Sequence, residues 1–198
     1  MFITELANIY SKKPYLSNIV PFHDVAPQIE QFLIQEVRLG ANNLNPYRFS
    51  YKFAHPPKDI INLFVAFSAD EGPLKKLYRY DCMNCDATNI MNDEELLNFK
   101  CYNCSSSDDM ESQNFLENVR VIFEIKEPYL KEIKIRLKGQ ASSDKKVYKG
   151  KPEGAINTDV TLKDIMGGNT TGEIVIDPKL LDLQEKLMHK ISIGINNT

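Results

Sequence analysis

Apolar side chains recur at helical spacing in three separate stretches near the start of the chain. The first covers residues 24–40, where Asp24 is a good N-cap and Gly40 is a good C-terminal stop. The second covers 46–53 and the third covers 58–70. The pattern therefore predicts three consecutive helices.

Further along the chain, apolar and polar residues alternate as they do in strands. This alternation is found over residues 74–80, 119–125 and 133–137, and a shorter strand is predicted over 172–176. A last helix is predicted from residue 178, because leucines then recur at helical spacing. Helices and strands in separate runs are typical of an α+β protein, and this is the fold class that we expect.

We expect four parts along the chain. Residues 1–23 are predicted to be an N-terminal appendage that packs on the remainder, and 24–80 to be a helical domain that ends in a strand. Residues 81–110 contain all the cysteines, and 111–198 form a small C-terminal α+β module. Within that module, 139–158 is rich in Gly, Ser, Lys and Pro, and we expect a mobile loop there.

The composition is ordinary for a soluble globular protein, with 42% hydrophobic and 26% charged residues. No apolar run reaches the roughly 18 residues of a membrane-spanning helix, and the N-terminus lacks the basic and apolar regions of a signal peptide. We therefore expect a cytoplasmic protein. In a reducing compartment, paired cysteines are more often metal ligands than disulfides.

The four cysteines are spaced Cys-x2-Cys-x15-Cys-x2-Cys, at Cys82, Cys85, Cys101 and Cys104. Two cysteines three positions apart lie on a tight turn and can both ligate one ion, and 15 residues between the pairs allow a strand, a turn and a returning strand. Four thiolates fill every position of a tetrahedral ion, so the spacing predicts one structural Zn²⁺ of zinc-ribbon type. An iron centre uses similar ligands and stays an alternative, whereas a redox pair would need only one of the two Cys-x2-Cys units.

The predicted helices lead through a glycine into a strand that runs directly into the first cysteine pair. The residues of this junction are Glu71-Gly72-x-Leu74 and Tyr78-x-Tyr80-x-Cys82-x-x-Cys85. In this order, residues 24–105 resemble winged-helix domains that continue into a zinc ribbon, as in the transcription factor E alpha family and in bacterial winged-helix/zinc-ribbon regulators. The resemblance implies a winged-helix domain and, with it, DNA binding. A plain three-helix bundle with no role at nucleic acid fits the same pattern.

In a winged helix, the third helix would be the recognition helix. The polar residues that residues 58–70 offer for this purpose are Lys58, Asn62 and Ser68, and most of the remaining surface is apolar. Such a helix suits a protein surface better than the major groove, where base edges are read by Arg, Lys, Asn and Gln.

Charge is distributed unevenly, although the net charge is only −3. Residues 81–110 include seven acidic residues and one lysine, which makes the cysteine region a poor surface for phosphate. Residues 134–151 include seven basic residues and Asp144, with the first three basic residues expected on the exposed face of the strand over 133–137. The candidates for contacts with phosphates or with an acidic partner are Lys134, Arg136, Lys138, Lys145, Lys146, Lys149 and Lys151.

Arrangements of catalytic residues are scarce. The three histidines lack metalloprotease spacing, and no phosphate loop is present, so we expect no enzymatic activity. We expect a non-enzymatic, zinc-binding adaptor or regulatory subunit that engages a larger protein partner. A nucleic-acid-binding regulator of transcription type is the alternative, and an accessory subunit of a nuclease or of a bacterial defence-type complex is a third.

Overall fold

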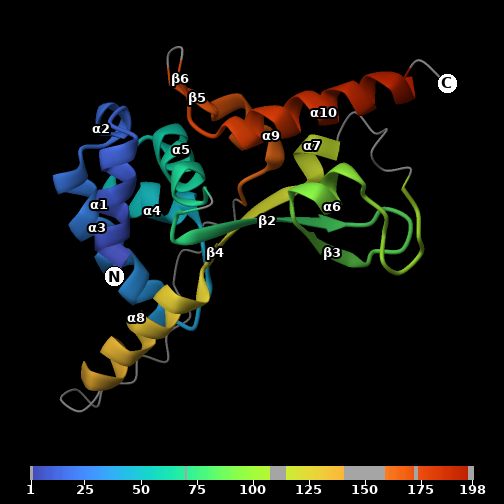
Figure 1. The fold of residues 1–198 in the computed structure, drawn as a ribbon. Coiled ribbons are helices and arrows are strands. Elements are labelled where there is room, and N and C mark those ends of the chain that lie inside the picture. Colours follow the sequence, from blue (N-terminus) through green and yellow to red (C-terminus); the bar gives the residue numbers. More distant parts are fainter. Residues whose placement is uncertain (1, 70, 108–114, 141–158, 172–173, 196–198) are drawn as a thin grey trace.

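The computed structural model describes residues 2–69, 71–107, 115–140, 159–171 and 174–195 (Figure 1). Helices from the N-terminal and C-terminal parts of the chain pack against one face of a four-stranded antiparallel sheet, as expected for an α+β protein. None of the helices in these ranges is long and apolar enough to cross a membrane.

The N-terminal part folds into five helices that lie together on the left of Figure 1. They are α1 (Phe2–Lys12), α2 (Leu16–Ile19), α3 (Phe22–Arg38), α4 (Pro46–Phe53) and α5 (Pro57–Phe67). The three predicted helices are confirmed as α3, α4 and α5, although α3 begins two residues before the predicted N-cap, directly after a proline.

Local sequence explains where α4 begins and ends. The side chain of Asn45 accepts a hydrogen bond from the amide of Tyr47 at 2.9 Å, and Pro46 occupies the first turn, where its missing N–H costs nothing. The helix ends where Ala54 adopts a left-handed conformation with φ of 55°.

Helix α5 is the centre of the hydrophobic core. Every residue from Ile60 to Phe67 is buried, and the helix contacts α1, α2, α4 and the first long strand of the sheet. The ring of Phe64 packs edge-on against Phe49 of α4 at 6.0 Å and against Phe123 of the sheet at 5.6 Å between centroids. A helix that is apolar on all sides must be covered on all sides, and this requirement positions the elements around it.

The sheet consists of β1 (Asn43–Leu44), β2 (Leu74–Asp81), β3 (Thr88–Met91) and β4 (Arg120–Ile125), in the order β1-β4-β2-β3. Successive side chains alternate between its two faces. One face is buried under the helices and includes Tyr78, Tyr80 and Phe123. The opposite face includes Arg79 and Arg120, which are exposed.

The C-terminal part closes the core from above in Figure 1. Helix α9 (Leu162–Gly168) packs on α5, and α10 (Pro178–Ile195) packs on α9 and on α6 (Asp93–Leu97). Between α9 and α10, the chain forms the hairpin of β5 (Thr170–Thr171) and β6 (Ile174–Val175).

Two buried polar residues join the ends of that hairpin. The amide group of Asn169 donates to the backbone carbonyl of Asp177 at 2.9 Å, and the backbone N–H of Asp177 donates back to Asn169 Oδ1 at 2.9 Å. The carboxylate of Asp177 also accepts a hydrogen bond from Lys76 on β2 at 3.3 Å, so the hairpin is tied to the sheet. These contacts orient α10 relative to α9.

The sheet joins segments that the sequence pattern places in separate parts. β4 was expected within the C-terminal module 111–198, yet it lies between β1 and β2, which belong to the predicted domain 24–80. Alternation along the chain indicates that a strand exists but carries no information about its partners, and pairing across long sequence separations is decided by tertiary packing.

The prediction of a strand over residues 133–137 is wrong. These residues belong to helix α8 (Glu127–Gln140), which packs on α3. Leu130, Ile133 and Leu137 are three and four positions apart and form its inner stripe, whereas Ile135, which alternation would bury, is 70% exposed. The alternation of apolar and basic residues was therefore coincidental.

The predicted mobile loop over 139–158 lies almost entirely outside the described residues.

Two short helices, α6 and α7, lie near the cysteines in the sequence. Helix α6 begins with a capping box formed by Asn92 and Glu95, and α7 (Phe115–Asn118) leads directly into β4.

Replacement of Phe64 by alanine should lower the free energy of unfolding by about 3–5 kcal/mol, because it removes a buried ring at the junction of α4, α5 and the sheet. Denaturant unfolding followed by circular dichroism would measure the change. As a control, Tyr51→Ala on the exposed side of α4 should change stability by no more than about 0.5 kcal/mol. Equal effects for both variants would contradict the central role of α5.

Candidate metal centre

The sulfur atoms of Cys82, Cys85, Cys101 and Cys104 all lie within 4.8 Å of one another. The Sγ atoms of Cys82 and Cys104 are 3.7 Å apart, and those of Cys85 and Cys101 are 3.6 Å apart. Four sulfurs at ~2.3 Å from a central ion in tetrahedral geometry would be separated by ~3.8 Å. The four cysteines are free thiols, and their arrangement is compatible with a bound metal ion.

Each cysteine pair lies on the same kind of turn. The amide of Asp86 donates to the carbonyl of Cys82 at 2.8 Å, and the amide of Ser105 donates to the carbonyl of Cys101 at 2.9 Å. Asp86 and Ser105 each follow the second cysteine of their pair, and both are left-handed, with φ of 56° and 60°. Asp and Ser tolerate this region better than β-branched residues do, so the two turns can present their thiols in equivalent ways.

The first turn connects β2 to β3, and the second follows α6. An aromatic cluster beneath them joins the site to the core: the ring of Tyr80 lies 5.2 Å from that of Phe99 and 5.2 Å from that of Phe115. Phe99 immediately precedes the second turn, and Phe115 lies on α7. Burial of these three rings therefore contributes to holding the second turn close to the first.

Asn89 links the two turns. It lies on the buried face of β3, where its Nδ2 donates to the carbonyl of Ala87 at 2.9 Å and lies 3.8 Å from the sulfur of Cys101. Its Oδ1 accepts a hydrogen bond from the amide of Tyr102 at 3.1 Å. A donor that faces a ligating sulfur orients it and stabilises its negative charge.

Sequence reasoning missed Asn89. The one available signal was an asparagine at an inward position of a strand, where alternation otherwise places apolar side chains such as Met91. A buried amide requires hydrogen-bonding partners, and here they include Ala87, next to the first turn, and Tyr102 in the second turn.

Backbone N–H groups favour the thiolate form on the second turn. Hydrogen bonds from the amides of Cys104 and Asn103 lower the pKa of Cys101 to about 6, and a hydrogen bond from the amide of Ser106 lowers the pKa of Cys104. Burial acts in the opposite direction at Cys82 and raises the pKa of its thiol to about 12. Since a metal binds thiolates, the second turn is the better prepared of the two for coordination.

The other predicted contact residues lie elsewhere. Lys134, Arg136 and Lys138 are exposed on α8, at the lower left of Figure 1 and far from the cysteine turns. Arg136 pairs there with Glu30 of α3 at 2.9 Å. Lys145, Lys146, Lys149 and Lys151 lie outside the described residues.

The three residues proposed for a recognition helix have different environments. Lys58 is exposed, and the hydroxyl of Ser68 donates to the carbonyl of Val65 at 2.9 Å. Asn62 is only 2% exposed, because α9 covers it. A Cβ atom on Gly168 of α9 would lie 2.8 Å from Asn62 Oδ1, so the two helices approach closely at this point. In this arrangement Asn62 is not available to a base edge.

Within the described part of the chain, the four cysteines are the one group of potential metal ligands close enough to share an ion. Comparisons with protein-family models, with curated proteins and with solved structures find no significant match. A four-sulfur set leaves no coordination position for water or substrate, and the centre is therefore suited to holding the two turns together.

Replacement of Asn89 by alanine should weaken metal binding by about 10-fold to 100-fold, because the variant loses both the donor near Cys101 and the link between the turns. Competition with a chromophoric chelator would measure the affinity. Asn118→Ala, an exposed asparagine at the end of α7, is the matched control and should leave the affinity unchanged. Unchanged affinity in Asn89→Ala would show that its hydrogen bonds do not support the site.

Proposed function

We propose that this chain is a non-enzymatic adaptor or regulatory subunit that holds one structural Zn²⁺ and engages a larger protein partner. The observation that supports this proposal most directly is the burial of α5 from Ile60 to Phe67, which leaves little of the helix for a major groove. The zinc centre would fix the shape of one end of the molecule, and the exposed surface at that end would meet the partner.

Zinc is the metal that best fits the site. It accepts four thiolates in tetrahedral geometry without a preference imposed by d electrons, and such sites are structural. The spacing between sulfurs and the two equivalent turns support this assignment. Iron in a similar four-sulfur site is the alternative, and it would be recognised by its colour.

The order of elements supports the resemblance to winged-helix proteins. The chain runs α3, β1, α4, α5, β2, β4, and these strands lie in the order β1-β4-β2. In that comparison, the described residues between β2 and β4, which include the four cysteines, would belong to the wing. α5 would then be the recognition helix.

DNA reading by α5 is nevertheless disfavoured. A recognition helix must expose side chains to the major groove, and the residues of α5 from 60 to 67 are buried under α1, α2, α4 and α9. The net charge of −3 adds no general attraction for DNA. The same framework therefore fits a protein-binding role better than a DNA-reading one.

The surface proposed for the partner lies at the cysteine turns. Met83 and Tyr102 directly follow the first cysteine of each pair and are 67% and 74% exposed. Ile90 on β3 is also exposed, and it lines a shallow groove together with Tyr102. Tyrosine and methionine are enriched in the centres of protein interfaces.

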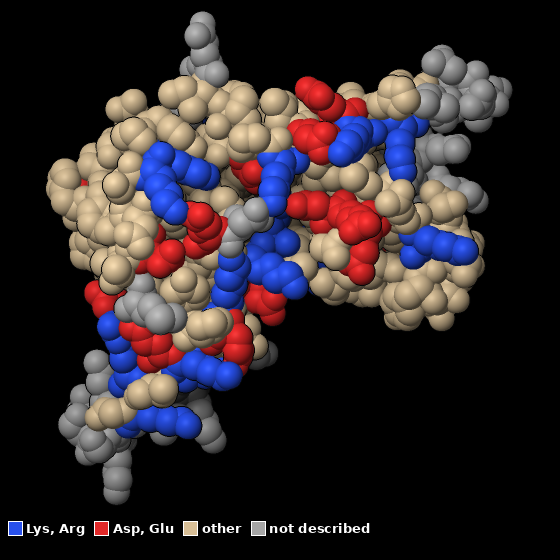
Figure 2. All heavy atoms as spheres, viewed as in Figure 1, with Lys and Arg blue, Asp and Glu red and all other residues tan. Residues whose placement is uncertain are grey.

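The charge around this surface indicates the kind of partner. Figure 2 shows mostly uncharged surface at the end of the molecule that contains the turns, next to a group of acidic side chains. Asp86, Glu94 and Glu95 are exposed near the turns. A partner with an apolar centre and a basic rim would be complementary, whereas a phosphate backbone would be repelled.

One observation favours the nucleic-acid alternative. Lys131, Lys134 and Lys138 are exposed on one side of α8, at helical spacing. They can contact phosphates without reading sequence, and such binding would be weak and strongly dependent on salt. The accessory subunit of a nuclease or of a bacterial defence-type complex stays a separate, third hypothesis.

Purified protein should contain about one zinc per chain and no iron chromophore, which elemental analysis and visible absorption would measure. Cys101→Ser should lose the metal and unfold the region around the turns, since zinc binding contributes on the order of 10 kcal/mol to such segments. Ser107→Ala, an exposed neighbour of the second turn, should keep both metal and fold. A coloured iron protein, or full zinc content in Cys101→Ser, would refute the zinc proposal.

The partner proposal is tested by isolating the complex from native cells, identifying the partner, and reconstituting a defined complex from purified components. The double variant Met83→Ser/Tyr102→Ser should weaken that complex at least about tenfold, because it removes two exposed anchors from the proposed surface. Met188→Ser/Tyr51→Ser replaces the same residue types at exposed positions on α10 and α4, and it should bind as the parent does.

The competing functions give different results in DNA titrations. For the adaptor, duplex binding should be weak and without sequence preference, with a log–log salt slope of about −3 to −5 for three to five phosphate contacts. Nanomolar affinity for one sequence, together with the absence of a stable protein partner, would rule out the adaptor and support the regulator.

A further inference from the structure

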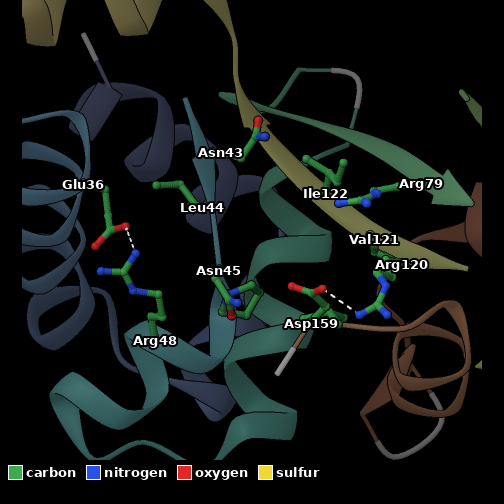
Figure 3. A pocket seen from close by; sticks show the side chains of 12 residues that line it. Glu36, Asn43, Leu44, Asn45, Arg48, Arg79, Arg120, Val121, Ile122 and Asp159 are labelled. Atoms are coloured by element: carbon green, nitrogen blue, oxygen red, sulfur yellow. Dashed lines mark hydrogen bonds and ion pairs between the residues drawn. The ribbon is translucent and has the colours of Figure 1, made fainter. Parts of the chain in front are cut away.

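A pocket of about 220 Å³ lies beside β4, at the point where that strand changes its neighbour (Figure 3). β1 pairs with one half of β4, up to Phe123. The other half pairs with residues 159–162: the amide of Val121 donates to the carbonyl of Val160 at 2.6 Å, and Arg120 lies opposite Thr161. The pocket fills the gap between these two partners.

Two arginines lie directly opposite each other at this pocket. The register of β2 and β4 pairs Arg79 with Arg120 on the exposed face of the sheet, and both line the pocket. Figure 3 shows Arg79 extending across β4 beside Ile122, and Arg120 turned toward Asp159. Like charges directly opposite on neighbouring strands destabilise a sheet, so this pair costs stability unless negative charge lies nearby.

One carboxylate beside each arginine supplies this negative charge but uses only part of the hydrogen-bonding capacity of the guanidinium groups. Arg79 pairs with Asp81 at 3.3 Å, and Asp81 also accepts a hydrogen bond from the hydroxyl of Thr88 at 2.5 Å. Arg120 pairs with Asp159 through a single contact at 2.7 Å. A guanidinium has five N–H donors, so these contacts leave donors on both arginines for a ligand with several oxygens.

The third arginine of the pocket has a different role. Arg48 donates to Glu36 at 2.7 Å, and that carboxylate is buried. Figure 3 places this ion pair across β1 from Arg79 and Arg120. Removal of Arg48 would leave a buried carboxylate without its partner, so Arg48 stabilises the fold and does not belong to the ligand site.

We propose that the pocket binds a small phosphate monoester, with Arg79 and Arg120 holding the phosphoryl group between them. Guanidinium groups bind phosphate through paired N–H donors, and a dianion competes for them better than a single carboxylate does. Ile122, which is partly exposed on the same sheet face as the two arginines, also lines the pocket and can contact an organic substituent. The volume lies below the ~300–1,000 Å³ of sites that enclose drug-sized ligands, so the pocket would enclose the phosphoryl group and only the nearest part of a larger substituent.

This site is independent of the proposed adaptor function. The phosphoryl group could come from free phosphate or from a nucleotide, and the two sources differ in the substituent that would contact Ile122. The test uses the full chain with its metal, titrated calorimetrically with inorganic phosphate, adenosine 5′-monophosphate and adenosine at constant ionic strength. Phosphate and the nucleotide should bind with one site per chain, and adenosine should not.

The double variant Arg79→Gln/Arg120→Gln should weaken phosphate binding at least about tenfold, because it removes the charge-assisted donors. Lys134→Gln/Lys138→Gln removes the same charge from α8 and is the matched control, with unchanged binding expected. Arg79→Lys/Arg120→Lys keeps the charge but loses the planar fork, and its binding should also weaken. Circular dichroism and metal content would confirm that each variant is folded.

Tighter binding of the nucleotide than of phosphate would support a role for Ile122, and equal binding would support a site for the phosphoryl group alone. The proposal is overturned if neither compound binds, if adenosine binds as well as its monophosphate, or if the glutamine variant binds phosphate as the parent does.

Discussion

The burial of α5 on every side is the constraint on which the remainder of the structure depends. A helix with apolar residues around its whole circumference cannot face water on any side, so it recruits α4 and the N-terminal helices, the sheet and α9. α9 comes from the far end of the chain, and its Gly168 permits close approach to Asn62. Burial of α5 therefore joins parts of the chain that are distant in sequence, and it closes the surface that a recognition helix would need.

The cysteine region is held together by different contacts from those of the helical core. Phe99 and Phe115, from the segment between β2 and β4, pack against Tyr80 of β2 in an aromatic cluster. Beyond that cluster, two short turns hold four sulfurs close together, where a metal ion would supply the cohesion that a hydrophobic core supplies elsewhere. Asn89 connects the turns, and the exposed Met83 and Tyr102 depend on them for their positions.

One face of the sheet is buried and stabilises the fold, and the other face is exposed to solvent. Its buried face contacts the helices through Tyr78 and Phe123. On the other face, Arg79 of β2 lies directly opposite Arg120 of β4. Along β4, the neighbouring segment changes from β1 to residues 159–162, and the pocket lies between these two segments. Thus the cysteine cluster, the exposed Met83 and Tyr102, and the pocket with Arg79 and Arg120 all lie on or next to a single sheet.

The sequence alone determined the features that depend on local spacing: the cysteine pairs, the cap at Asn45, and the apolar periodicity of α3 and α5. Local patterns failed where two periodicities coincide, since Ile133 and Leu137 fit both a strand and the helix α8, and only packing on α3 distinguishes them. Tertiary structure alone decided that β4 lies between β1 and β2, that Asn89 reaches both turns, and that Arg79 faces Arg120. The physical reason is that spacing fixes the direction of a side chain relative to its own backbone, whereas its partner depends on which distant segments burial brings together.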